Sequence, residues 1–138
     1  MHQYPKQPHF KSQNDWKQTM KQILPQDRLV ANVATTPFTK WKNSDGSDSN
    51  TEILQLGDSK KLGTGFHIYR MAPGSSSEAH EHQGDEEFFV IEGSLRDNDG
   101  TTYGKGDLIL LKDGTQHLSV SDEGCLLVVY IPREETNL

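Results

Sequence analysis

Residues 74–93 of this chain have the sequence GSSSEAHEHQGDEEFFVIEG, in which three potential metal ligands stand between two glycines. These ligands are His80, His82 and Glu86. Side chains two residues apart in a β-strand project to the same face about 6.6 Å apart, because a strand rises roughly 3.3 Å per residue. The three side chains therefore share one face, provided that residues 84–85 do not shift the register, and two imidazoles at this spacing can bind one ion.

A fourth potential ligand lies in the segment GDLILLKDGTQHLSVS, residues 106–121, where His117 follows a glycine turn. Three imidazoles and one carboxylate suit Fe(II), Zn(II), Mn(II) or Ni(II), and they leave positions open for reactants. For an isolated His80–His82 pair, two surface histidines in a polar loop would be the better interpretation. Four ligands and regularly spaced glycines favour one divalent ion per chain, with Fe(II) or Zn(II) preferred.

Strand alternation separates the two adjacent glutamates. Glu87 is expected on the face opposite Glu86, exposed or at an interface. Phe88 and Val90 share the parity of Glu86, so we expect them to form an apolar wall beside the metal, although a plain core role is compatible with the same pattern.

A neighbouring predicted strand, residues 65–71, carries two further polar candidates for the pocket wall. His67 and Tyr69 are two residues apart and therefore share one face of this strand, which we expect to be the face toward the pocket. The alternative for His67 is a buried histidine whose role is limited to an ordinary hydrogen bond.

Gly74, His80, His82, Glu86 and Gly93 have the spacing of the first cupin motif, and the chain thus resembles the cupin superfamily. The second cupin motif is matched more loosely over residues 106–121. There, Lys112 and Ser121 stand where cupins usually have Pro and Asn, while the ligand position is filled by His117.

Within the cupins, residues 72–117 look like the ChrR-type group, which is similar to the C-terminal domain of a bacterial zinc anti-sigma factor and to acetylacetone-cleaving dioxygenases. The resemblance implies a jelly-roll barrel with the metal inside. It also implies two functions: a non-haem dioxygenase acting on a small diketone or hydroxyketone, or a non-enzymatic sensor or regulatory cupin that binds metal or a small ligand. The anti-sigma role itself needs a separate zinc-binding helical domain. This chain has only one cysteine and one predicted helix, so that role is not expected here.

The rest of the pattern predicts an all-β fold with a short N-terminal helical extension. A helix is expected over Ser12–Leu24, ending at Pro25, and residues 43–51 are expected to form a mobile loop. Turn formers separate short apolar segments after that loop, which favours a jelly roll. The predicted strands cover residues 29–33, 38–41, 52–56, 65–71, 87–92, 94–97, 106–111, 117–120 and 125–131. We expect residues 1–34 to form an arm and a helix that pack on a barrel of residues 35–138.

Composition limits the partners of the chain. Its 138 residues fit one domain, and a net charge of -6 with scattered basic residues argues against nucleic acid. A single cysteine and the absence of a long apolar stretch predict a cytoplasmic protein with no membrane segment. Residues 88–91 and 126–130 are apolar on both faces, so a second covering is expected from the opposing sheet, the N-terminal helix or a second subunit. Of these we expect a homodimer. The functions implied by the resemblance predict a small-molecule substrate or ligand.

Overall fold

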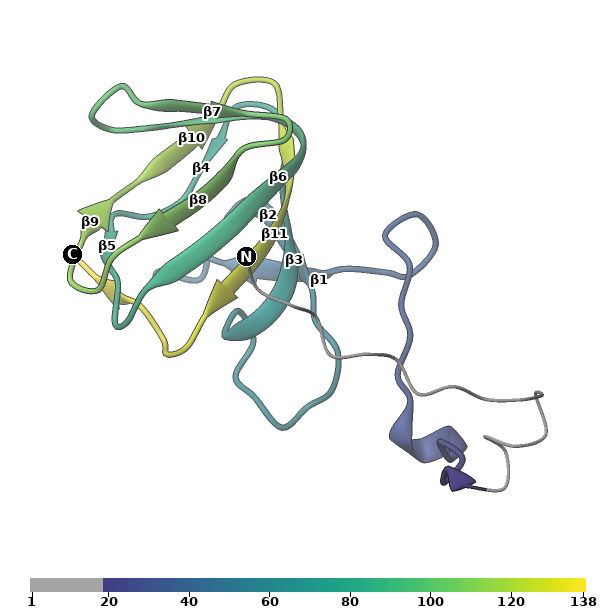
Figure 1. Ribbon diagram of the computed structural model, residues 1–138. Coiled ribbons are helices and arrows are strands. Elements are labelled where there is room, and N and C mark those ends of the chain that lie inside the picture. The colour runs from purple at the N-terminus through teal and green to yellow at the C-terminus, as the bar shows by residue number, and fades with distance from the viewer. Residues whose placement is uncertain (1–18) are drawn as a thin grey trace, which may run out of the picture.

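The computed structural model describes residues 19–138, and residues 1–18 lie outside the described part. The regular secondary structure of the described part is almost entirely β-strand, as predicted (Figure 1). The first strands are β1 (Thr39–Lys42), β2 (Asp48–Leu54), β3 (Gly65–Met71), β4 (Ser75–Ser76), β5 (His80–Glu81) and β6 (Glu86–Asp97). They are followed by β7 (Thr102–Gly104), β8 (Leu108–Leu111), β9 (Gln116–His117), β10 (Ser119–Ser121), β11 (Cys125–Ile131) and β12 (Thr136–Asn137).

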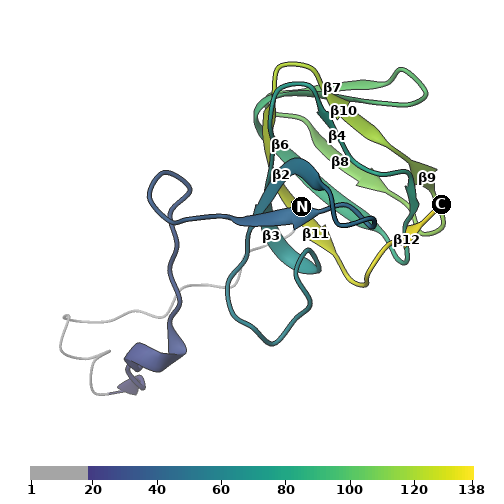
Figure 2. The same ribbon diagram turned by 180° about the vertical axis from the view of Figure 1, so that it is seen from behind.

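The strands curl into a barrel that is built around β6 and β11 (Figures 1 and 2). The larger sheet has the order β1-β2-β3-β11-β6-β10-β4, and β7 and β8 also pair with β6. A small sheet of order β12-β5-β9 lies at one end of the barrel (Figure 2). This small sheet carries two of the candidate metal ligands and the C-terminal segment.

Gly93 is the point at which β6 passes from one side of the barrel to the other. Residues before it pair with β8 and β11, whereas residues after it pair with β7 and β10. The register with β11 shifts beside this point, between Leu126 and Leu127, and Gly93 has φ +77°. A glycine at such a bulge lets the strand bend sharply. The two strands predicted on either side of Gly93 are therefore one bent strand.

The barrel interior is filled by alternate residues of the long strands, as the period-2 pattern predicts. The buried core cluster consists of Met71, Phe88, Val90, Leu95, Cys125, Leu127, Val129 and Ile131. Tyr69, Tyr103, Ile109 and Leu111 pack against it.

The outer face of the same strands is also apolar. Strand pairing aligns one uninterrupted row across five strands, made of Leu54, Ile68, Val128, Phe89 and Leu108. Phe89 and Leu108 are 40% and 80% exposed in the single chain. The expected second covering of these strands therefore does not come from residues 19–138.

Two predictions for residues 29–51 are wrong. Residues 29–33 form no strand, because a turn at Asn32, whose side-chain oxygen accepts a hydrogen bond from the Ala34 amide, redirects the chain. Residues 48–51 belong to β2 and are not a mobile loop. Ser49 and Thr51 are buried there at little cost, since their hydroxyls bond each other and Ser49 donates to the Trp41 carbonyl.

Most of the predicted helix over Ser12–Leu24 lies outside the described residues. Within them, residues 21–24 are not helical, and a short 3-10 turn, η1 (Pro25–Asp27), follows. Leu24 has φ -72° and ψ 155°, the extended conformation that a following proline favours, so the predicted helical conformation at Leu24 is wrong. Among residues 19–138, no helix is long and apolar enough to cross a membrane.

Candidate metal centre

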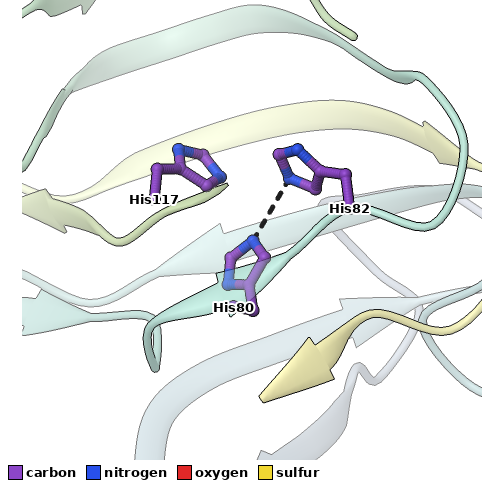
Figure 3. A group of neighbouring side chains, drawn as sticks. All are labelled: His80, His82 and His117. Carbon is purple, nitrogen blue, oxygen red and sulfur yellow. Dashed lines mark hydrogen bonds between the residues drawn. The ribbon is translucent and has the colours of Figure 1, made fainter. Parts of the chain in front are cut away.

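Three histidine side chains meet at the end of the barrel where the small sheet lies (Figure 3). His80 on β5 is the direct partner of His117 on β9 in the antiparallel register. His82 follows β5 immediately, and its backbone exchanges hydrogen bonds with residues 114 and 115. The ring centroids of each pair of histidines are 4.7 to 5.1 Å apart, and the rings meet edge to face. Glu86, the first residue of β6, faces the same point.

The ligand atoms are spaced like atoms that share one ion. Nε2 of His82 lies 3.3 Å from Nε2 of His80 and 3.5 Å from a carboxylate oxygen of Glu86. The same oxygen is 3.8 Å from Nε2 of His117. When two ligand atoms each lie about 2.1 Å from a metal ion, and the angle between them at the ion is about 90° to 109°, the two atoms are about 3.0 to 3.4 Å apart. A small contraction around an ion would therefore bring these atoms to bonding distance.

Hydrogen bonds at the far side of each ring determine which nitrogen faces the centre. Nδ1 of His80 lies 2.7 Å from the Glu78 carbonyl oxygen. Nδ1 of His82 lies 2.9 Å from the Thr115 hydroxyl, and Nδ1 of His117 lies 2.9 Å from the Asp97 carboxylate. The Thr115 hydroxyl uses its own hydrogen on the Lys112 carbonyl, so it accepts from the ring. With the proton on Nδ1, each Nε2 presents a lone pair to the centre. Three such lone pairs and a carboxylate oxygen that face one point could hold a metal ion.

Electrostatics differ among the three rings. Burial lowers the pKa of His80 below its ordinary value, so this ring is neutral at pH 7. Burial also acts to lower the pKa of His117, but the hydrogen bond and the charge of Asp97 outweigh it and raise that pKa above 6.5. A metal ion therefore competes with a proton more at Nε2 of His117 than at Nε2 of His80.

Asp97 supports the site from behind, a role that was not predicted from the sequence. Its buried carboxylate accepts hydrogen bonds from His117, from the Ser119 hydroxyl at 2.7 Å and from the Tyr103 phenol at 2.7 Å. These donors lower its pKa despite burial, which acts to raise it. A carboxylate behind a histidine fixes the orientation of the ring and increases its basicity toward a metal.

Glu135 is a second carboxylate at the centre that the sequence analysis did not identify. A carboxylate oxygen of Glu135 lies 3.4 Å from Nε2 of His80. Potential ligand atoms fall into two groups within which all lie within 4.8 Å of one another: His80, His82 and His117, and His82, Glu86 and Glu135. Burial and the nearby Glu86 carboxylate raise the pKa of Glu135 well above its ordinary value.

A cavity of about 310 Å³ adjoins the centre inside the barrel. His67, Tyr69 and Phe88 form part of its wall, together with His80, Glu86 and His117. Nδ1 of His67 donates to the Gly65 carbonyl at 3.0 Å. Val90 is fully buried in the core and is not part of the wall. Glu87 is exposed, on the face opposite Glu86.

Comparison with known families identifies the fold of this barrel. Residues 27–132 match the family described as the ChrR cupin-like domain. The chain belongs to this family. The predicted cupin fold and the predicted ChrR-type resemblance are confirmed, and the match begins before the barrel, within the residues predicted to form the N-terminal arm. No curated protein sequence is similar enough to match this ChrR-type cupin.

Solved structures with low sequence identity share the cupin fold. An acetylacetone dioxygenase from Acinetobacter johnsonii has 14% identity and a TM-score of 0.65, with 99% of this chain and 85% of that chain covered. The polyketide cyclase RemF from Streptomyces resistomycificus has 20% identity and a TM-score of 0.62, with 80% and 85% covered. The structure of Rhodobacter sphaeroides SigE with the anti-sigma ChrR has 15% identity and a TM-score of 0.56, with 96% and 71% covered.

Proposed function

We propose that this cupin is a metal-dependent dioxygenase that acts on a small diketone or hydroxyketone. The observation that carries the proposal is the convergence of three imidazole lone pairs and the Glu86 carboxylate at the wall of an internal cavity. The cavity volume of about 310 Å³ lies at the lower end of the range of small-molecule sites, which is about 300 to 1,000 Å³. The similarity of fold to an acetylacetone dioxygenase supports the choice of substrate class.

The residues of the chain have separable roles in this proposal. His80, His82, Glu86 and His117 would hold one divalent ion, Fe(II) or Zn(II) in preference to Mn(II) or Ni(II). Such an ion polarises the oxygens of a bound ketone as a Lewis acid. Phe88 and Val129 supply apolar wall that excludes water. Burial raises the pKa of Tyr69 to about 12, so its phenol stays protonated and can donate to a substrate oxygen.

Oxygen uptake tests this function directly. Protein loaded with Fe(II) under anaerobic conditions is mixed with aerated β-diketones and α-hydroxyketones, and dissolved oxygen is followed. We expect uptake with at least one compound, and none with the His82→Ala variant under the same loading. If no member of the panel is consumed although Fe(II) is bound, the dioxygenase proposal is refuted.

The second candidate function is a non-enzymatic sensor in which the metal or a small ligand regulates a partner. The similarity to the structure of SigE with anti-sigma ChrR, and a second carboxylate that could fill an open coordination position, favour this candidate. Zinc in protein purified without added metal, without exchangeable water on the ion, would support the sensor, because structural zinc sites are closed. Iron with exchangeable water would support the enzyme.

A homodimer is the oligomeric state that we propose. The apolar row on the outer face of the barrel runs across five strands, and the exposed side chains of Phe66, Leu110 and Tyr130 flank it. An uninterrupted apolar sheet face of this width costs free energy when it is exposed, and a twofold axis would let two copies cover it with the same surface.

The Phe89→Lys variant tests the dimer. We expect the wild-type chain to have the mass of two chains by light scattering, and the variant to have the mass of one, because a charge cannot be buried on this row without a partner. Val30→Lys is the control: Val30 is 81% exposed and precedes the first strand, so its replacement should leave the mass unchanged. A monomeric wild-type chain would refute the dimer.

The cytoplasm is the compartment that we propose for the protein. The chain has one cysteine, Cys125, which is 6% exposed in the barrel core. Burial raises the pKa of its thiol, so the sulfur stays protonated and weakly reactive. A single protected thiol suits a reducing environment.

A further inference from the structure

The C-terminal strap, defined as residues 132–138, reaches the metal centre from a part of the sequence that contains neither cupin motif. Glu135 stands in the strap immediately before β12, and its carboxylate lies 3.4 Å from Nε2 of His80. Its oxygen, an oxygen of Glu86 and a ring nitrogen of His82 all lie within 4.8 Å of one another. Glu135 thus lies beside three of the four ligands already described, namely His80, His82 and Glu86.

Several contacts that do not involve a metal hold the strap in this place. β12 pairs with β5, so that Thr136 and Asn137 lie opposite Glu81 and His80. The Leu138 amide donates to the Ala79 carbonyl at 3.0 Å, and the Gln83 side chain donates to the Thr136 hydroxyl at 3.0 Å.

The start of the strap packs against the turn between His82 and Glu86. A Cβ atom on Gly84 would lie 2.5 Å from the Pro132 ring, so a glycine is needed for this approach. The position of Glu135 is therefore set by backbone pairing on one side and by close packing on the other.

Charge also points to a cation beside Glu135. Within residues 19–138, no lysine or arginine forms an ion pair with this carboxylate. The neighbouring Glu134 is exposed and pairs with Lys61 at 2.8 Å. Two carboxylates, Glu86 and Glu135, approach three imidazole nitrogens whose protons are on the opposite side of each ring. A divalent ion among these atoms neutralises the repulsion that they would otherwise exert on one another.

We propose that Glu135 is a fifth protein ligand of the metal, so that metal binding fastens the C-terminal strap over the cavity. Glu134, Glu135 and Asn137 belong to the cavity wall, so the strap is well placed to control entry. Five protein ligands would leave little room on the ion for a substrate that binds through two oxygens. Binding of such a substrate would then require Glu135 to move away. The strap thereby links substrate binding to opening of the cavity, an extension that rests on the proposed function.

Zinc affinity and amide exchange of the strap test this assignment without an activity assay. Zn(II) affinity is measured by competition with a chromophoric chelator for the wild type, Glu135→Gln and Glu134→Gln. We expect Glu135→Gln to bind Zn(II) at least about tenfold more weakly, since even groups behind the ligands contribute about 10- to 100-fold. Glu134→Gln, one residue away and exposed, should differ from the wild type by less than about twofold.

Hydrogen exchange supplies the second readout. Zn(II) should slow exchange of the amides of residues 136–138 in the wild type and in Glu134→Gln, and should have no effect on them in Glu135→Gln. Equal Zn(II) affinity of Glu135→Gln and Glu134→Gln, or strap exchange that does not respond to Zn(II) in the wild type, overturns the assignment. If the wild type does not bind Zn(II) at all, the metal centre is refuted, and the proposed function with it.

Discussion

Replacing His82 with Ala is expected to remove most of the bound metal. His82 belongs to both groups of potential ligand atoms and is 1% exposed, so its replacement removes the one ligand atom that the two groups share. Its Nε2 lies 3.3 Å from His80 and 3.5 Å from Glu86. We expect affinity to fall by more than about 100-fold, the upper value for groups that only support a ligand.

Elemental analysis and thermal unfolding measure this effect together. At a free metal concentration of about 100 times its dissociation constant, the metal should stabilise the wild type by about 2.7 kcal/mol, and this gain should disappear in His82→Ala. The His67→Gln variant is the control, because His67 lies in the cavity wall but in neither ligand group. Full metal stoichiometry in His82→Ala would contradict the ligand set.

Replacing Gly93 with Ala is expected to prevent stable folding. A Cβ atom at Gly93 would lie 2.0 Å from the Gly124 carbonyl oxygen and 2.8 Å from the Cys125 Cα, and φ is +77°. Both contacts are with backbone, so no change of rotamer relieves them. We expect a loss in the free energy of unfolding above about 4 kcal/mol, beyond the usual effect of a point substitution.

Gly74 provides a matched control, since it is the other glycine that brackets the ligand motif. Its φ is +80°, but a Cβ atom there would meet nothing within 4 Å. Gly74→Ala should therefore cost only the conformational penalty of about 1 to 2 kcal/mol. Urea unfolding compares the two variants, and similar losses for both would show that the contact with Gly124 is not limiting.

Much of the barrel could be predicted from the sequence, because inward and outward side chains alternate regularly along its long strands. The strands Gly65–Met71 and Cys125–Ile131 were predicted with the observed bounds. Alternation also placed Glu86 inward and Glu87 outward, as observed. The start of β2 was missed because Ser49 and Thr51 are polar and are buried by mutual hydrogen bonding, which a hydrophobic pattern does not record.

The supporting groups of the centre could not be predicted for a different reason. Asp97 lies at a hairpin turn, where aspartate is common without any further role, and it meets His117 only through the pairing of β6 with β10. Glu135 lies in a polar segment beside a two-residue strand, which is too short for a periodic signal. Both contacts depend on how strands that are distant in the sequence pair with one another, and no local sequence pattern records that pairing.

The place of β11 between β3 and β6 also governs how the barrel is assembled. Its pairing partners include Gly65 at one end of β3 and Glu87 near the start of β6, both far away along the chain. Non-local pairing of this kind slows folding, because the entropy of closing long loops is lost before the contacts form. Until β11 arrives, β3 and β6 have unpaired edges, and these edges are open to pairing with other chains. Conditions that slow the insertion of this one strand should therefore favour aggregation over folding.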